Sequence, residues 1–197
     1  MAMKPIPTRY KGYHFRSRLE ARWAVFFDAL GIRWEYELEG FELDDGTRYL
    51  PDFYLPELHY YIEIKPLPNN FDGQPWPEEG SKEEKFILHL CQHPDDLSGN
   101  YYILFGSPGW AVPYDPASQY AGCTVGDSPY FFCECEHCSV VGIAFDGRSA
   151  RLDHKPDCCV PKTMSDKNYN INSDRILAAA DAAKSARFEF GESGATL

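Results

Sequence analysis

The sequence predicts an α+β fold, and three observations support this prediction. Between residues 17 and 106, segments with helical apolar spacing alternate with short apolar runs typical of strands, in the order α-β-β-β-α-β. Six of the seven cysteines then crowd into residues 123–159. An alanine-rich stretch of helical composition follows near the C-terminus. We therefore expect a sheet with helices packed on it, a small cysteine-rich module and a C-terminal helix.

Each expected element has a local signal. Ser17 and Glu20 have the spacing of a capping box at the start of the first helix, and Gly31 has the position of a helix-ending glycine. The dipeptide Asp45-Gly46 is typical of a hairpin turn. Residues 4–15 contain prolines and a glycine and predict an extended arm. The expected helices are 17–30, 81–91 and 173–187, and the expected strands are 32–38, 47–54, 59–64 and 100–106.

Composition divides the chain into three expected parts. Residues 1–112 carry the alternating helices and strands. Residues 113–165 begin in a Pro/Gly/Ser-rich linker and contain the cysteine cluster, and residues 166–197 contain the C-terminal helix. No apolar stretch reaches the roughly 20 residues of a membrane span, and no secretory signal is visible. We expect a soluble, cytoplasmic protein with no membrane partner.

The charge of the chain is unevenly distributed. The formal net charge is −11, which excludes a protein that coats nucleic acid by bulk positive charge. The first 23 residues nevertheless carry six positive side chains and one negative one. Aromatic residues alternate with these cations and could stack on unpaired bases. The predicted nucleic-acid contacts are Arg9, Lys11, Arg16, Arg18 and Arg22, with Arg16 and Arg18 favoured.

Two short segments bring carboxylates and an amine to neighbouring strands. Asp52 follows Pro51, and Glu63 and Lys65 are two residues apart in a strand, so they share one face. Two adjacent carboxylates suit Mg²⁺ or Mn²⁺, and a lysine beside them can orient water or stabilise developing charge. The alternative is a turn aspartate and the solvated face of an edge strand. The apolar flanks of Glu63 argue against this alternative.

Pro51-Asp52 and Glu63-Ile64-Lys65, within this order of elements, resemble the PD-(D/E)xK nuclease superfamily. The resemblance covers about residues 8–106 and extends to small phage and bacterial members with a cysteine-rich tail. It implies a restriction-endonuclease-like fold and metal-dependent hydrolysis of phosphodiesters. It favours DNA over RNA and endonuclease over exonuclease action, and both alternatives stay open. By this resemblance Asp52 and Glu63 bind the metal, Glu20 completes its shell and Lys65 activates water. Glu20 has a competing role in the capping box.

The cysteine cluster has the layout of a zinc ribbon. Cys135 and Cys138 form a C-x-x-C knuckle, residues 140–145 and 148–152 read as a hairpin, and Cys158 follows. The fourth ligand is His154 or Cys159, with Cys133 as a less favoured candidate. His154 is slightly favoured because adjacent cysteines rarely bind one zinc. A structural Zn²⁺ is therefore expected, and the alternative is a set of thiols without metal. The module could also contact a protein partner, and a homodimer remains open.

A second function is compatible with the same residues. The acidic body outside the basic arm suits a catalytically inactive binding module that interferes with a partner by mimicking the charge of nucleic acid. A third reading makes the zinc module the functional part, which recruits the core to a complex. Both readings stay open at the level of sequence.

Overall fold

The computed structural model describes residues 5–66, 79–93, 100–108, 113–114, 130–145, 158, 169–170 and 172–188. Within these residues the chain has a mixed α+β fold with three helices and several small sheets. The helices are α1 (Arg18–Ala29), α2 (Lys82–Gln92) and α4 (Asp174–Ser185). They confirm the three helices expected from the sequence to within a few residues at each end.

The largest sheet has five strands in the order β3-β6-β7-β8-β9. Strands β7 and β8 are parallel, and the other neighbours are antiparallel. This parallel pair is joined through α2, as parallel strands require a crossover connection. The strands of this sheet are β3 (Glu35–Tyr36), β6 (Phe53–Leu55), β7 (Tyr60–Lys65), β8 (Asn100–Phe105) and β9 (Pro113–Tyr114).

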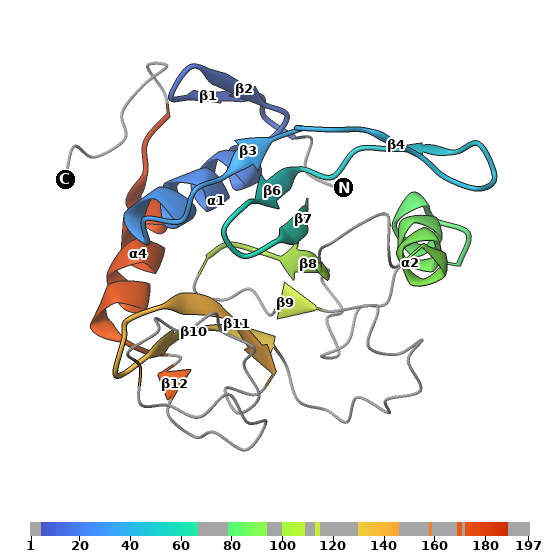
Figure 1. The fold of residues 1–197 in the computed structure, drawn as a ribbon. Coiled ribbons are helices and arrows are strands. Elements are labelled where there is room, and N and C mark those ends of the chain that lie inside the picture. Colours follow the sequence, from blue (N-terminus) through green and yellow to red (C-terminus); the bar gives the residue numbers. More distant parts are fainter. Residues whose placement is uncertain are drawn as a thin grey trace.

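The two faces of the sheet belong to different buried clusters. Ile62 and Ile64 of β7 pack in a cluster with α1. Glu63, which lies between them in the strand, points to the other face. On that other face, Phe86 and Ile87 of α2 pack with Tyr49 and Ile103. Figure 1 shows α1 and α4 together and α2 apart from them, beside β4. The sheet is therefore covered on both faces.

Both ends of α1 follow from its sequence. The Ser17 side chain accepts a hydrogen bond from the backbone N–H of Glu20 at 3.1 Å. At the other end, Gly31 has φ +68° and donates to the Asp28 carbonyl at 3.0 Å, and Ile32 donates to the Phe27 carbonyl at 2.9 Å. These two bonds form a Schellman motif. The predicted start and end of this helix are confirmed.

Two expected strands are shorter than predicted. The strand expected over 32–38 is reduced to β3, because Glu37 takes a φ of +48° that an extended strand does not accommodate. The strand expected over 47–54 splits into β5 (Arg48–Tyr49) and β6. β5 pairs with β4 (Phe41–Glu42), whereas β6 pairs with β3 and β7. The chain changes partners at Pro51, which lacks an N–H to continue a ladder.

The N-terminal arm is a hairpin and not an isolated extended segment. Strands β1 (Thr8–Tyr10) and β2 (Tyr13–Phe15) are antiparallel and joined by Lys11 and Gly12. Both linking residues have positive φ, at 47° and 82°, as a type I′ turn requires. Asp28 of α1 accepts from the Tyr10 hydroxyl at 2.8 Å and pairs with Lys11 at 2.9 Å. The hairpin is thus fastened to α1.

The cysteine-rich region contains a strand pair that the sequence analysis did not predict. Strand β11 (Val141–Phe145) is antiparallel to β10 (Tyr130–Cys135), and β12 (Tyr169–Asn170) lies on the other side of β10. The expected partner over 148–152 lies outside the described residues. The knuckle Cys135–Cys138 therefore stands at the turn of its own hairpin, because the apolar run before it supplies a strand that the linker prediction overlooked.

The C-terminal helix joins α1 and the cysteine-rich hairpin. Ile176 and Ala183 of α4 belong to the same buried cluster as Phe26 of α1 and Phe132 of β10. Figure 1 shows α4 running beside α1, with β10 and β11 near the N-terminal end of α4.

The domain boundaries at 112/113 and 165/166 stay predictions. Among the described residues, no helix has the length and apolar character needed to cross a membrane.

Candidate active site and candidate metal centre

Asp52 and Glu63 lie on adjacent antiparallel strands. The register Phe53↔Ile62 places Asp52, one residue before β6, opposite Glu63. The Asp52 Oδ2 atom accepts from the backbone N–H of Ile64 at 2.7 Å, and Asp52 is only 2% exposed. β7 lies between β6 and β8, and Glu63 is 6% exposed. The alternative of a turn aspartate and an edge-strand face is therefore wrong.

Two tyrosines form a hydrogen-bonded chain with Glu63. The Tyr49 hydroxyl donates to Glu63 Oε2 at 2.8 Å and lies 2.6 Å from the Tyr101 hydroxyl. Both tyrosines are buried. Burial first, and then the neighbouring charges, raise the pKa of Tyr101 and of Tyr49 well above the usual value. These two residues were not predicted, because nothing local in the sequence indicates that β5 and β8 meet at Glu63.

Lys65 joins Glu63 to the second helix. Its Nζ atom lies 2.8 Å from Glu63 Oε1 and 2.5 Å from Glu83 Oε1, near the N-terminus of α2. Burial alone lowers the pKa of Lys65, but the carboxylates of Glu63 and Glu83 outweigh it and raise that pKa above the usual value. Lys65 is therefore protonated at neutral pH. In this arrangement it can donate hydrogen bonds and stabilise negative charge, but it cannot accept a proton.

The pKa of Asp52 is raised well above that of a free aspartate. Burial is the largest cause, followed by the charges of Glu63 and Glu20, while the Ile64 N–H and Arg16 act in the opposite direction. Burial likewise raises the pKa of Glu63, against the effect of Lys65. Buried carboxylates that repel one another favour a bound cation or a shared proton. This electrostatic coupling is the property that a divalent-metal site requires.

Glu20 approaches from the other face of the sheet. Its Oε2 atom accepts from the Tyr36 hydroxyl at 2.7 Å and from the backbone N–H of Arg16 at 3.1 Å. The reciprocal half of a capping box, a bond to the Ser17 N–H, is replaced by the bond to Arg16. Glu20 is buried, at 6% exposed. Its carboxylate is therefore tied to the segment before the helix and acts on Asp52 through its charge.

Arg16 occupies the position of a cation beside Asp52. Its guanidinium contacts Asp52 Oδ1 through Nη2 and Glu37 Oε1 through Nε, the latter at 2.9 Å. The Arg16 side chain is 56% exposed. The Asp52 charge raises the pKa of Arg16 in spite of burial, which by itself lowers it. The residue predicted as a nucleic-acid contact thus lies directly at the predicted catalytic carboxylate.

The other predicted nucleic-acid contacts are more dispersed. Arg9 Nε donates to His14 Nδ1 at 3.4 Å across the exposed side of the hairpin, and Lys11 pairs with Asp28. The Nε atoms of Arg18 and Arg22 are buried and have no hydrogen-bond partner among the described residues. The aromatic residues between these cations were expected to stack on unpaired bases. Tyr10, Phe15 and Trp23 are instead buried in the core, and Tyr13 is exposed.

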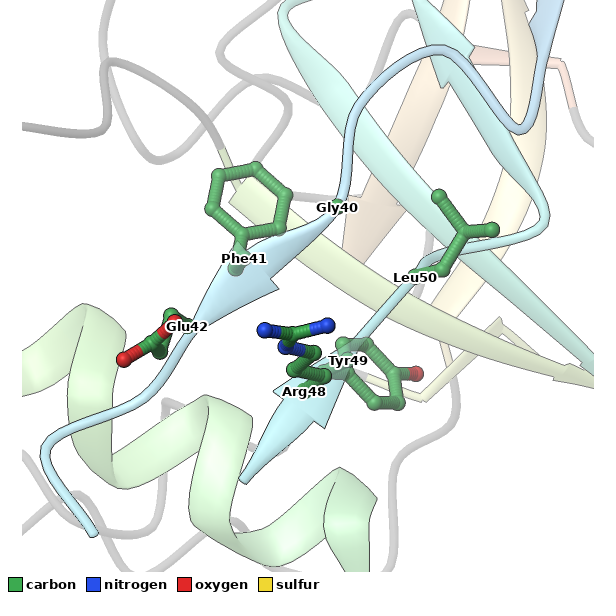
Figure 2. A pocket seen from close by; sticks show the side chains of 6 residues that line it. All are labelled: Gly40, Phe41, Glu42, Arg48, Tyr49 and Leu50. Carbon is green, nitrogen blue, oxygen red and sulfur yellow. The ribbon is translucent and has the colours of Figure 1, made fainter. Parts of the chain in front are cut away.

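A pocket of about 260 Å³ lies beside this site, between β4 and β5. Figure 2 shows the Arg48 guanidinium extending between the two strands, with the phenol group of Tyr49 directed away from it. The pocket is lined by Gly40, Phe41, Glu42, Arg48, Tyr49 and Leu50. Tyr49 is shared by the pocket and the carboxylate site. None of the predicted catalytic residues lines the pocket.

Three cysteines form the candidate metal centre. The Sγ atoms of Cys135, Cys138 and Cys158 lie within 4.8 Å of one another, and those of Cys135 and Cys158 are 3.8 Å apart. A tetrahedral zinc with Zn–S bonds of about 2.3 Å holds its sulfur ligands about 3.8 Å apart. None of the three cysteines is in a disulfide. The donor set and spacing fit Zn²⁺, as the sequence predicted for these three residues.

The remaining ligand candidates differ in position. His154 and Cys159 lie outside the described residues, so the choice between them stays a prediction. Cys133 is fully buried, and its Sγ atom is 3.7 Å from the Gly142 carbonyl oxygen. Burial, followed by the charge of Cys135, raises the pKa of Cys133 to about 12. Cys133 is therefore a core thiol and not part of the cluster.

The carboxylates do not form a comparably closed set. Among the described residues, two groups of three or more ligand atoms lie within 4.8 Å of one another: the cysteines above, and Asp44 with His89 and His93. Glu20, Asp52 and Glu63 are not such a group, since Glu20 belongs to the helix on the opposite face.

Comparison of the chain with family models, curated proteins and solved structures found no match.

Proposed function

We propose that the chain is a divalent-metal-dependent nuclease that hydrolyses phosphodiester bonds in DNA. The observation that carries the proposal is the juxtaposition of Asp52, Glu63 and Lys65 on two neighbouring strands of one sheet. It is the arrangement that the resemblance to PD-(D/E)xK nucleases requires. The proposal assigns metal binding to the two carboxylates and stabilisation of developing charge to the lysine.

The hydrogen bonds of the two carboxylates favour an external cation. In each, one oxygen is held by a buried donor, the Ile64 N–H or the Tyr49 hydroxyl. The other oxygen contacts a more exposed cationic side chain, Arg16 at Asp52 and Lys65 at Glu63. Asp52 Oδ1 would bind the ion once Arg16 moves away, and Glu63 would share it. A bound Mg²⁺ or Mn²⁺ supplies Lewis-acid stabilisation and a more acidic water.

The protein groups around the carboxylates then have separate tasks. Lys65, held protonated by Glu63 and Glu83, donates hydrogen bonds to a phosphoryl oxygen or a water. Tyr49 and Tyr101 fix the orientation of Glu63 from the buried side. Arg16, displaced from Asp52, is close enough to neutralise a phosphate of the substrate.

A cleavage assay tests the proposal. The protein is incubated with single-stranded, double-stranded and branched DNA and with RNA, in Mg²⁺, Mn²⁺ or EDTA. We expect metal-dependent cleavage that falls at least about 100-fold in Glu63→Gln and in Lys65→Ala, because each removes a group that acts on the transition state. Glu57→Gln and Lys82→Ala, both exposed, serve as controls and retain activity. Full cleavage by the two site variants would contradict the proposal.

A second candidate function is a non-catalytic binding module. The observation that favours it is that Arg16 and Lys65 already neutralise Asp52 and Glu63 within the chain. Isothermal titration with Mn²⁺ separates the two functions. Binding that is lost in Asp52→Asn supports the nuclease. An absence of Mn²⁺ binding, together with an absence of cleavage, supports the binding module.

A further inference from the structure

Two histidines and an aspartate meet at the C-terminal end of α2, away from Glu83 in its first turn. His89 and His93 are four residues apart, so they lie on one side of the C-terminal end of the helix. Their rings are 4.7 Å apart between centroids. Asp44 reaches them from the turn between β4 and β5, which is far away in the sequence. None of these residues takes part in the carboxylate site or the cysteine cluster.

The ligand atoms have the spacing of a metal site. The Nε2 atom of His93 lies 3.0 Å from Asp44 Oδ1, and the Nδ1 atom of His89 lies 3.4 Å from Asp44 Oδ2. All three groups offer a ligand atom within 4.8 Å of the others. Zn–N and Zn–O bonds of about 2.0–2.1 Å in a tetrahedral site give a ligand spacing of about 3.3 Å. Small side-chain adjustments therefore suffice to bind one ion.

The backbone around the site is held in place by other contacts. Lys85, one turn before His89, pairs with Asp45 at 2.7 Å and donates to Thr47 at 3.3 Å. These contacts fasten the β4–β5 turn to α2 beside Asp44. His89 is largely buried, and its Nδ1 atom faces the Asp44 carboxylate at 3.4 Å without the alignment of a hydrogen bond. A buried imidazole nitrogen that faces a carboxylate without a well-aligned hydrogen bond is open to a ligand.

We propose that Asp44, His89 and His93 bind a divalent transition-metal ion of the zinc class. Neutral imidazole nitrogens and a carboxylate oxygen are typical ligands of Zn²⁺ and Ni²⁺, and they leave a position for water. The ion would clamp the β4–β5 hairpin onto α2. These elements supply Tyr49 to Glu63 and Glu83 to Lys65, so the clamp would hold two supports of the carboxylate site. The site does not depend on the proposed nuclease function.

The test is a Ni²⁺ titration of the full chain carrying Asp52→Asn, which removes metal binding at the carboxylate site; the protein is kept reduced and preloaded with one equivalent of Zn²⁺ for the cysteines. We expect one further equivalent of Ni²⁺ to bind and to raise the melting temperature, since an ion that binds the folded state stabilises it. The double variant H89Q/H93Q should lose both the second equivalent and the shift. The variant His59→Gln, at an exposed turn, should keep both.

Two outcomes would overturn the inference. One is a parent protein that takes up no metal beyond the zinc of the cysteines. The other is equal Ni²⁺ uptake by the parent and by H89Q/H93Q. The alternative that these residues only hydrogen-bond to one another predicts both. If the double variant fails to fold, Asp44→Asn replaces it, because half of the Asp44 side chain is exposed and the change keeps its shape.

Discussion

Asp52 is buried beside a backbone donor and a guanidinium, and two further carboxylates act on it. Its raised pKa means that the metal-free folded state binds a proton more tightly than the unfolded chain does. The free energy of unfolding therefore falls as the pH rises from the unfolded pKa, about 3.9, through the folded one. The acidic charge that disfavours folding here is the charge that a divalent ion would neutralise.

Without metal, the pH dependence of the free energy of unfolding should differ between the parent and Asp52→Asn. As the pH rises above the unfolded pKa of about 3.9, the parent should lose stability by up to about 1.4 kcal/mol per pH unit for this carboxyl. The variant should show a flatter profile, because the amide does not titrate. Urea denaturation at several pH values measures the slopes. Asp181→Asn, 81% exposed, should follow the parent, and identical slopes in all three proteins would refute the raised pKa.

At the residue scale, chemically distinctive residues were predicted and their partners were not. Glu63 and Lys65 were identified because charges interrupt an apolar strand. Tyr49, Tyr101 and Glu83 were missed, since an ordinary strand tyrosine or first-turn glutamate gives no local signal of the group that it contacts. Their roles depend on strand order, which brings β5, β8 and α2 to the same side chains.

At the element scale, the β10–β11 hairpin combines a metal knuckle with a core strand. Cys133 and Cys135 are two residues apart on β10, and both are buried, yet only Cys135 belongs to the thiol cluster. The turn places Cys138 beside it, with Ser139 in a left-handed conformation at φ 57°. The Ser139 N–H donates to the Cys135 carbonyl at 2.8 Å. The hairpin turn thus brings two thiolate ligands together.

Cobalt substitution distinguishes ligand from core thiol in this hairpin. Co²⁺ bound by thiolates absorbs in the near ultraviolet through sulfur-to-metal charge transfer, and an Asp/His site lacks this band. We expect Cys138→Ser to lose most of the band, because a ligand is removed from a set of four. Cys133→Ala should keep it. Equal bands in Cys138→Ser and the parent would show that the three thiols do not bind metal together.

At the scale of the whole molecule, Arg175 connects three separate parts of the chain. From the first turn of α4 its guanidinium donates to the Leu30 carbonyl at the end of α1. It also donates to the Ser139 carbonyl at 2.9 Å and to Glu134 at 3.3 Å, next to the cysteine knuckle. The shared core of α1, β10 and α4 supports these contacts. Arg175 therefore couples the helix pair to the candidate zinc centre.

Replacement of Arg175 by alanine should weaken both parts at once. We expect the free energy of unfolding to fall by about 1–3 kcal/mol, since carbonyls at two sites lose a charged donor. Release of zinc to a chromogenic chelator should also become faster. Asp181→Ala, on the exposed side of α4, should change stability by less than about 0.5 kcal/mol. A variant that is destabilised but releases zinc at the parent rate would contradict the coupling.

The sequence by itself determined the helices, their caps and the residues of the candidate sites. Ser17, Gly31 and the C-x-x-C spacing act through bonds to neighbours within a few residues, so local sequence is sufficient to predict them. The same holds for the buried strand that carries Glu63 and Lys65. All of these signals act between residues that are close together in the sequence.

Only the tertiary structure decided which groups meet. Pairing of β6 with β7 sets Asp52 against Glu63, pairing of β10 with β11 brings Cys138 beside Cys135, and packing of α2 on the β4–β5 turn joins Asp44 to His89 and His93. Sheet register and helix docking are fixed by burial of apolar faces from distant segments. No local window of sequence contains both sides of such a contact, so neither the grouping of Asp44 with His89 and His93 nor the hydrogen bond from Tyr49 to Glu63 could be predicted.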